Sequence, residues 1–102
     1  MKTFTERIYE KLRLVPSGKV TTYAELARAL HSHAYRAVGT ALKHNPDPHH
    51  TPCYKVVRSD GFVGFYSGPG GIQKKIQLLQ SEGIHVHNRK INLKTYLFRF
   101  EK

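Results

Sequence analysis

The chain has 102 residues, of which 39% are hydrophobic and 24% are charged, so it suits one globular domain and is too apolar for a disordered chain. Seventeen lysine and arginine residues against seven acidic residues give a formal net charge of +10 at pH 7. This surplus points to a polyanionic partner, most often nucleic acid, and a solvated basic surface without a specific partner is the alternative.

The single cysteine, Cys53, excludes an internal disulfide and a multi-cysteine zinc site. Seven histidines include the pairs His31/His33, His49/His50 and His85/His87. None of these pairs has a second pair at the spacing of a zinc site, so we expect no metal. No segment approaches the roughly 20 apolar residues that span a bilayer, and the N-terminus lacks the features of a signal peptide. We therefore expect an intracellular protein.

The first predicted helix covers residues 4–14. Thr3 and Glu6 have the spacing of a capping box, in which two side chains bind free backbone amides at a helix start. Apolar residues with a four-residue period predict one buried stripe, which consists of Phe4, Ile8 and Leu12. A Pro-Ser-Gly turn at 16–18 ends this helix.

Two shorter helices, over about 22–30 and 34–44, are predicted on either side of a short turn. This arrangement is typical of a helix-turn-helix, here over residues 22–45. The outer face of its second helix carries Arg36, Thr40 and Lys43. Gly39, in the middle of that helix, costs about 1 kcal/mol relative to alanine, so we expect another group to pack tightly over it. DNA binding is the functional interpretation, and a helical hairpin in a bundle is the structural alternative.

A long loop rich in proline and glycine is predicted over residues 46–71. Within it, the Asp60-Gly61 pair lies between two apolar runs and predicts a small β-hairpin. The lone Cys53 follows a proline in the same loop, close to Lys55. A single cysteine most often packs as a small hydrophobe, whereas a cationic and accessible setting makes a thiol nucleophilic. From the residues alone, both interpretations stay open.

The C-terminal part of the chain is predicted to contain one more helix and short strands. The apolar stripe of the helix consists of Ile72, Ile76 and Leu79, and Gly83 follows in the capping position. Alternating apolar residues at 84–86 and 91–93 predict one or two strands. The expected fold class is therefore α+β and mainly α. It is a single domain over residues 1–102, with a winged-helix-like helix-turn-helix and a small β-hairpin next to the loop.

The loop around Cys53 resembles the active-site segment of the O6-alkylguanine-DNA alkyltransferases. The resemblance lies in residues 52–57, 59–61 and 64–68. Other segments match this family in order and approximate spacing: 16–23, 35–39, 45–46, 75–79 and 82–83. Together they cover most of the chain. In its small size and its tail over 83–96, the chain is also similar to the alkyltransferase-like proteins.

The resemblance implies direct reversal of O6-alkylguanine damage. Cys53 would attack the alkyl carbon of a guanine flipped out of duplex DNA, and the stable thioether product would limit each molecule to one turnover. No diffusible cofactor is implied. The helix-turn-helix would bind the minor groove of DNA that contains O6-alkylguanine, and we expect the protein to act as a monomer.

The resemblance also assigns roles to individual residues. The catalytic group would consist of Cys53, Tyr54, Glu82 and Asn45. Glu82 would end a proton relay, and Asn45 would tie the recognition helix to the active-site loop. The flipped guanine would be held by Tyr23, Val56, Tyr66 and Ser67. The DNA-binding residues would be Arg36, Thr22, Thr40, Lys43 and Lys55, with Arg36 filling the gap in the base stack. Each residue also has a structural alternative, such as a core tyrosine, a solvated cation or a helix cap.

Two residues depart from the family pattern, which usually has histidine and arginine where this chain has Tyr54 and Lys55. Histidine, with an ordinary pKa of about 6.5, can accept the thiol proton, whereas tyrosine, with an ordinary pKa of about 10, is a poor base at neutral pH. Tyr54 could still donate a hydrogen bond to a thiolate. The turn at 31–33 is also shorter than usual, and Pro69 is an added residue. We therefore expect alkyl transfer with altered activation.

Two other functions are alternatives. The first is a non-catalytic alkyltransferase-like protein that binds O6-alkylguanine and flags it for other repair factors. Such proteins commonly have tryptophan in place of the cysteine, whereas this chain keeps Cys53 and contains no tryptophan. The second is a sequence-specific regulator, which would prefer a particular undamaged sequence and be indifferent to Cys53→Ala.

Overall fold

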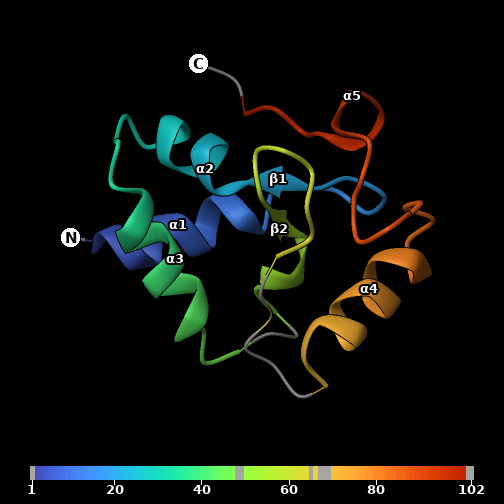
Figure 1. The fold of residues 1–102 in the computed structure, drawn as a ribbon. Coiled ribbons are helices and arrows are strands. Elements are labelled where there is room, and N and C mark those ends of the chain that lie inside the picture. Colours follow the sequence, from blue (N-terminus) through green and yellow to red (C-terminus); the bar gives the residue numbers. More distant parts are fainter. Residues whose placement is uncertain (1, 48–49, 65, 67–69, 101–102) are drawn as a thin grey trace.

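The computed structural model describes residues 2–47, 50–64, 66 and 70–100. Over these residues the helices are α1 (Phe4–Leu12), α2 (Tyr23–Ala29), α3 (Tyr35–Lys43), α4 (Gly71–Ser81) and α5 (Leu93–Tyr96). A 3-10 turn, η1 (Cys53–Lys55), precedes strand β2 (Val56–Val57), which pairs with β1 (Thr21–Thr22). Figure 1 shows α1, α2 and α3 on one side of the strands and α4 on the other. The expected mainly helical α+β class is confirmed. None of the helices in the described residues is long and apolar enough to cross a membrane.

Helix α1 begins at a complete capping box. The Glu6 N–H donates to Thr3 Oγ1 at 3.1 Å, and the Thr3 N–H donates to Glu6 Oε1 at 2.9 Å. Of the predicted stripe, Ile8 and Leu12 are fully buried, and Phe4 is partly buried against the same core. The helix ends at Leu12, slightly before the expected end, and the chain then turns toward β1.

Helices α2 and α3 form the predicted helix-turn-helix and pack against α1. In the turn, the Ser32 N–H donates to the Ala27 carbonyl at 2.9 Å. His31 has φ 57, in the left-handed region that short turns most often fill with glycine. The first hydrophobic core lies among these helices and η1; its fully buried members are Ile8, Leu12, Leu26, Ala27, Val38 and Val56.

The predicted β-hairpin is replaced by a parallel strand pair. Val56 pairs with Thr21 and Val57 pairs with Thr22. The turn at 58–61 does form, but Phe62 then makes an antiparallel bridge to Lys90 instead of pairing with β2. Val56 and Val57 are both fully buried, one in each of the two cores. A strand with both faces buried is typical of parallel pairing between covered layers, whereas a hairpin normally leaves one face in water.

The C-terminal region confirms the predicted helix cap but not the predicted strands. Gly83 has φ +84 directly after Glu82, the C-cap residue of α4, and the Ile84 N–H donates to the Leu79 carbonyl at 3.2 Å, as in a Schellman motif. The expected strand at 91–93 does not form: residues 91–92 are outside any regular element, and Leu93 begins helix α5, which the Asn92 side chain caps by accepting the Lys94 N–H. In the described tail, only isolated bridges form.

The tight packing predicted over Gly39 is absent. A Cβ atom at this position would meet no heavy atom within 4 Å outside the neighbouring helix backbone. We therefore expect Gly39→Ala to raise the free energy of unfolding by about 0.5–1 kcal/mol, because alanine loses less backbone entropy in a helix. Urea denaturation measures this change. Gly61→Ala is the contrasting variant and should be destabilised, since its Cβ would lie 2.5 Å from the Ile91 carbonyl oxygen at φ +90. A Gly39→Ala protein that unfolds at lower urea than the wild type would contradict the expectation.

Candidate active site

Cys53 begins η1, where the loop after α3 enters strand β2. Its N–H donates to the Thr51 carbonyl at 2.8 Å, and its own carbonyl accepts the N–H of Val56. The residue is 9% exposed and belongs to the first core, together with Tyr66. The thiol is therefore nearly buried at the edge of the core, and any substrate must be brought to it.

Asn45 joins the end of α3 to the segment that carries Cys53. Its Nδ2 donates to the Thr51 carbonyl at 2.7 Å, and its Oδ1 accepts the N–H of Asp47 at 3.0 Å. The Thr51 hydroxyl accepts a hydrogen bond of 2.9 Å from the Arg13 guanidinium. One backbone carbonyl therefore receives both Asn45 and the N–H of Cys53. The contact expected for Asn45 is present, and its role in catalysis stays a prediction.

Glu82 lies directly after α4 and is the centre of a buried polar network. Its side chain is 14% exposed. The Tyr54 hydroxyl donates to one of its carboxylate oxygens. The other oxygen accepts the N–H of Gly18 at 2.9 Å and lies 3.0 Å from Lys55 Nζ. This carboxylate therefore connects the turn after α1, the η1 segment and the end of α4.

Burial raises the pKa of Tyr54 well above its ordinary value of 10.0, and the hydrogen bond to Glu82 and the charge of that carboxylate raise it further. Burial alone would also raise the pKa of Glu82, but hydrogen bonds from Tyr54, Gly18 and Lys55 outweigh it and hold the pKa below 4.5. At neutral pH, Tyr54 is therefore protonated and Glu82 is ionised. The expectation that Tyr54 donates to a Cys53 thiolate is not met, because its single O–H is already donated to Glu82.

Lys55 and Thr22 differ from the prediction that they contact DNA. The Lys55 side chain is 6% exposed and pairs with Glu82. Its ammonium also donates to the carbonyls of Val15 and Pro16, at 3.3 and 3.0 Å. A buried lysine needs such partners, and here they come from distant parts of the chain. Thr22 is 5% exposed, and its hydroxyl accepts the Glu25 N–H at 3.0 Å, so its side chain caps α2.

Three tyrosine hydroxyls lie near enough to Cys53 to respond to its charge. Burial raises the pKa of Tyr9, Tyr23 and Tyr66, and negative charge on Cys53 raises each of them further. The Tyr9 hydroxyl donates to the Ala41 carbonyl at 2.6 Å. Tyr23 and Tyr66 are therefore protonated hydrogen-bond donors at neutral pH, as a residue that binds a developing anion must be.

Lys75 is a functional candidate that the sequence reasoning missed. It is 1% exposed, and its Nζ donates to the Val56 carbonyl at 2.7 Å. Burial lowers the pKa of Lys75 to about 8, and the negative charge of Cys53 opposes this effect. The signal was present in the sequence, because Lys75 lies three residues after Ile72 and four before Leu79, on the apolar stripe of α4.

A cavity of about 620 Å³ lies between Tyr23 and Tyr66, with Gly64 on its wall. Its size is in the range of small-molecule sites. Val56 was expected to bind guanine. Its carbonyl accepts a hydrogen bond from Lys75 Nζ, and a carbonyl oxygen has a second lone pair for another donor. Ser67, also predicted for this site, lies outside the described residues.

Helix α3 presents a polar face to solvent. Arg36, Thr40 and Lys43 are exposed on it, as expected. The opposite face is buried and consists of Val38, Ala41 and Leu42. Arg36 also lines a second cavity, of about 550 Å³, with Tyr23 and Arg58. Arg36 of α3 and Tyr23 therefore line the same cavity.

A family model described as 6-O-methylguanine DNA methyltransferase, DNA binding domain, matches residues 3–84. The chain belongs to this methyltransferase family. A bifunctional methyltransferase/endonuclease of Picrophilus torridus is 47% identical over 92 residues, which are 89% of this chain and 30% of the relative. A methylated-DNA–protein-cysteine methyltransferase of Thermococcus kodakarensis is 46% identical over 82 residues, 79% of this chain and 45% of the relative. The chain thus spans less than half the length of these two relatives.

The crystal structure of S. pombe Atl1 in complex with damaged DNA containing O6-carboxymethylguanine is similar over nearly the whole chain. The TM-score is 0.85 at 30% identity, and the match covers 97% of this chain and 99% of Atl1. The methyltransferase family acts in the repair of O6-alkylguanine and includes both methyltransferases and alkyltransferase-like proteins. In the part of this family member that the structure describes, no three His, Cys, Asp or Glu side chains group as metal ligands.

Proposed function

We propose that the protein repairs O6-alkylguanine in DNA by transferring the alkyl group to Cys53. The observation that carries this proposal is the hydrogen bond from Asn45 to the Thr51 carbonyl, which also receives the Cys53 N–H. It holds a nearly buried nucleophile and an exposed cationic helix as one unit. Tyr23 and Tyr66, which lie near enough to Cys53 to respond to its charge, line a cavity as protonated donors.

In the proposed reaction, the sulfur of Cys53 attacks the alkyl carbon, and the bond from that carbon to guanine O6 breaks. The electron pair of the broken bond stays on guanine, which takes up one proton, while the thiol gives up one proton. Tyr23, Tyr66 and Ser67 would donate toward the guanine as negative charge builds on it. The Lys75 ammonium favours the thiolate electrostatically. Because the new thioether is stable, each molecule would act once.

The duplex would lie on α3 through its minor groove. The alkyl carbon is inaccessible inside a stacked duplex, so the damaged base must be extruded. Arg36 would fill the vacated place, and Thr40 and Lys43 would contact the DNA backbone. We propose that the protein binds as a monomer and acts inside the cell, where its DNA substrate lies.

A non-catalytic lesion-binding function is the second candidate, and the Tyr54–Glu82 hydrogen bond favours it. Tyr54 keeps its proton, and the Glu82 carboxylate is occupied by three donors, so neither is arranged to accept the thiol proton. The likeness to Atl1 bound to damaged DNA supports the same candidate. In this function the protein would hold O6-alkylguanine out of the stack and flag it for other repair factors.

Intact-mass spectrometry tests the proposal. Incubation with duplex DNA that carries one O6-methylguanine is expected to add one methyl group to the protein, and peptide fragmentation should place it on Cys53. Cys53→Ala is the matched control, which should keep lesion binding and show no mass gain. Lesion-selective binding by the wild type without a mass gain would support the second candidate. Equal binding to damaged and undamaged duplexes would contradict both.

A further inference from the structure

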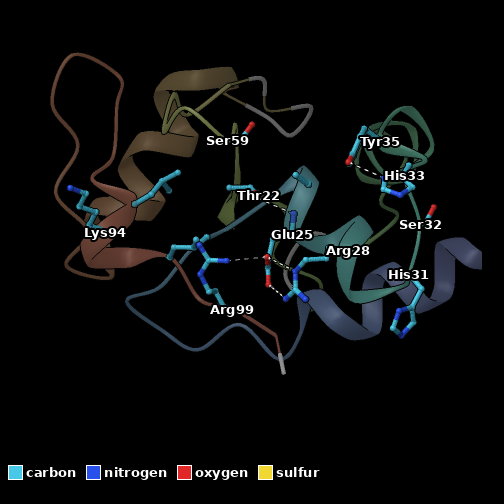
Figure 2. Close-up of a pocket in the computed structure, with 13 residues that line it drawn as sticks. Thr22, Glu25, Arg28, His31, Ser32, His33, Tyr35, Ser59, Lys94 and Arg99 are labelled. Carbon is cyan, nitrogen blue, oxygen red and sulfur yellow. Dashed lines mark hydrogen bonds and ion pairs between the residues drawn. The ribbon is translucent and has the colours of Figure 1, made fainter. Parts of the chain in front are cut away.

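A third cavity, of about 770 Å³, lies on the side of α2 that faces the C-terminal tail. We call it the tail pocket. Its basic side chains come from α2, from the helix-turn-helix turn and from the tail, and they are Arg28, His31, His33, Lys94 and Arg99. Figure 2 shows the guanidinium groups of Arg28 and Arg99 on either side of the Glu25 carboxylate.

The tail pocket has an excess of positive charge. Glu25 is its acidic lining residue; it is 5% exposed, and its carboxylate accepts two hydrogen bonds from Arg28 and one from the Phe100 N–H. Arg99 lies 4.0 Å from the same carboxylate, and its side chain is 73% exposed. No ion pair to Lys94 occurs among the described residues. The lining therefore contains one carboxylate, which Arg28 and Arg99 contact, and three cationic side chains, Arg28, Lys94 and Arg99, so positive charge is left for an external anion.

The wall supplied by the tail is fixed in place. The Val20 N–H donates to the Tyr96 carbonyl at 2.9 Å, and the Phe98 N–H donates to the Val20 carbonyl at 2.8 Å. The Arg28 guanidinium donates to the Phe100 carbonyl at 2.9 Å. Lys94 and Arg99 are thus presented from an anchored backbone, and little backbone ordering is needed when an anion binds. This wall lies beyond residues 3–84, which the family model matches.

The tail pocket is next to the cavity lined by Tyr23 and Arg36, since Ala24, Tyr35 and Ser59 line both. We propose that the tail pocket binds the phosphate backbone of the duplex that lies on α3, a few nucleotides from the extruded base. The inference rests on the proposed function, because the duplex must first be placed on α3. Guanidinium, ammonium and hydroxyl donors are the groups that recognise phosphate. Contacts of this kind strengthen binding to any duplex and carry no information about the lesion.

The salt dependence of DNA binding tests this assignment. Lys94→Gln/Arg99→Gln removes two charges from the tail pocket, and Arg7→Gln/Lys74→Gln removes two exposed charges that line neither this pocket nor the Arg36 cavity. Each phosphate contact contributes about 0.9 to the slope of log affinity against log salt, so the first variant should lose about 1–2 units of slope. It should also bind about tenfold more weakly at low salt, with an unchanged ratio between lesion and plain duplexes. The control variant should keep the wild-type slope.

Neutral methylphosphonate linkages identify the source of the anion. The linkages are placed singly along the strand. At one position, the neutral linkage should weaken DNA binding by the wild type and leave binding by Lys94→Gln/Arg99→Gln unaffected. Equal slopes for the two variants, or a loss of lesion preference in the tail-pocket variant alone, would overturn the proposal. So would unchanged DNA binding by that variant with lost binding to poly-glutamate, which would assign the pocket to an acidic protein. A wild type without lesion preference would contradict the proposed function. It would not contradict the phosphate contact, because the salt slopes are also measured on plain duplex.

Discussion

Replacement of Glu82 by alanine is expected to lower the free energy of unfolding by about 3–5 kcal/mol, since breaking a buried ion pair leaves the remaining charge uncompensated. The Lys55 ammonium would stay nearly buried with only two backbone carbonyls as partners. The Gly18 N–H and the Tyr54 hydroxyl would also lose their acceptor. Equilibrium urea unfolding followed by circular dichroism measures the change.

Glu82→Gln and Glu10→Gln are the controls for this loss. Glutamine at position 82 keeps an acceptor oxygen, so Glu82→Gln should lower the free energy of unfolding by less than Glu82→Ala. Glu10 is an exposed partner of Lys2, so Glu10→Gln should lower it by at most about 1 kcal/mol. The folded pKa of Glu82 is lowered below 4.5, so its contribution is fully present above pH 4.5 and is lost as the pH falls through the folded pKa. This acid-side loss should be missing in Glu82→Gln. A Glu82→Ala protein as stable as Glu10→Gln would contradict the role of Glu82 as a structural centre.

Tyr54→His should accelerate the proposed alkyl transfer at neutral pH by about 100-fold, the lower end of what a positioned general base contributes. In the wild type, burial and Glu82 keep Tyr54 protonated, so it does not accept the thiol proton. An imidazole at this position titrates near about pH 6.5 and can donate one N–H to Glu82 while its other nitrogen accepts a proton. Single-turnover transfer from O6-methylguanine duplex, followed by intact mass against time, measures the rate.

Tyr54→Phe separates the new base from the lost hydroxyl. Phenylalanine removes the hydrogen bond to Glu82 and adds no base, so its transfer rate should stay within a few-fold of the wild type. Histidine should also make the rate level off above about pH 7, where the imidazole is neutral. Equal rates for the histidine and phenylalanine variants would show that proton removal at position 54 does not limit the reaction.

The helices could be predicted because their signals are local. Thr3 caps α1 within one turn, and Gly83 ends α4 through hydrogen bonds to the turn before it. The strand pairing could not be predicted, because Val56 pairs with Thr21, which lies far earlier in the chain. A local Asp-Gly turn therefore suggested a hairpin, although the turn is used only to lead the chain toward Lys90.

In the candidate site, too, local features could be predicted and contacts between distant segments could not. The exposed face of α3 follows from helical periodicity, and the bond from Asn45 to Thr51 is a short-range contact. Lys55 was assigned to DNA binding and Lys75 was given no role, because the burial of both depends on acceptors from other segments. Single-sequence patterns do not show which carbonyl or carboxylate will meet a lysine in the fold.

The two-residue strand pair has a mechanical consequence for the proposed extrusion of a damaged base. Thr22 is bonded in register with Val57, so the start of α2, with Tyr23, and the segment just after η1 form one rigid block. Asn45 attaches the end of α3 to the same block. Cys53 therefore has little travel of its own, and in the proposed function the distance between it and a damaged base would be closed almost entirely by bending and unstacking the nucleic acid.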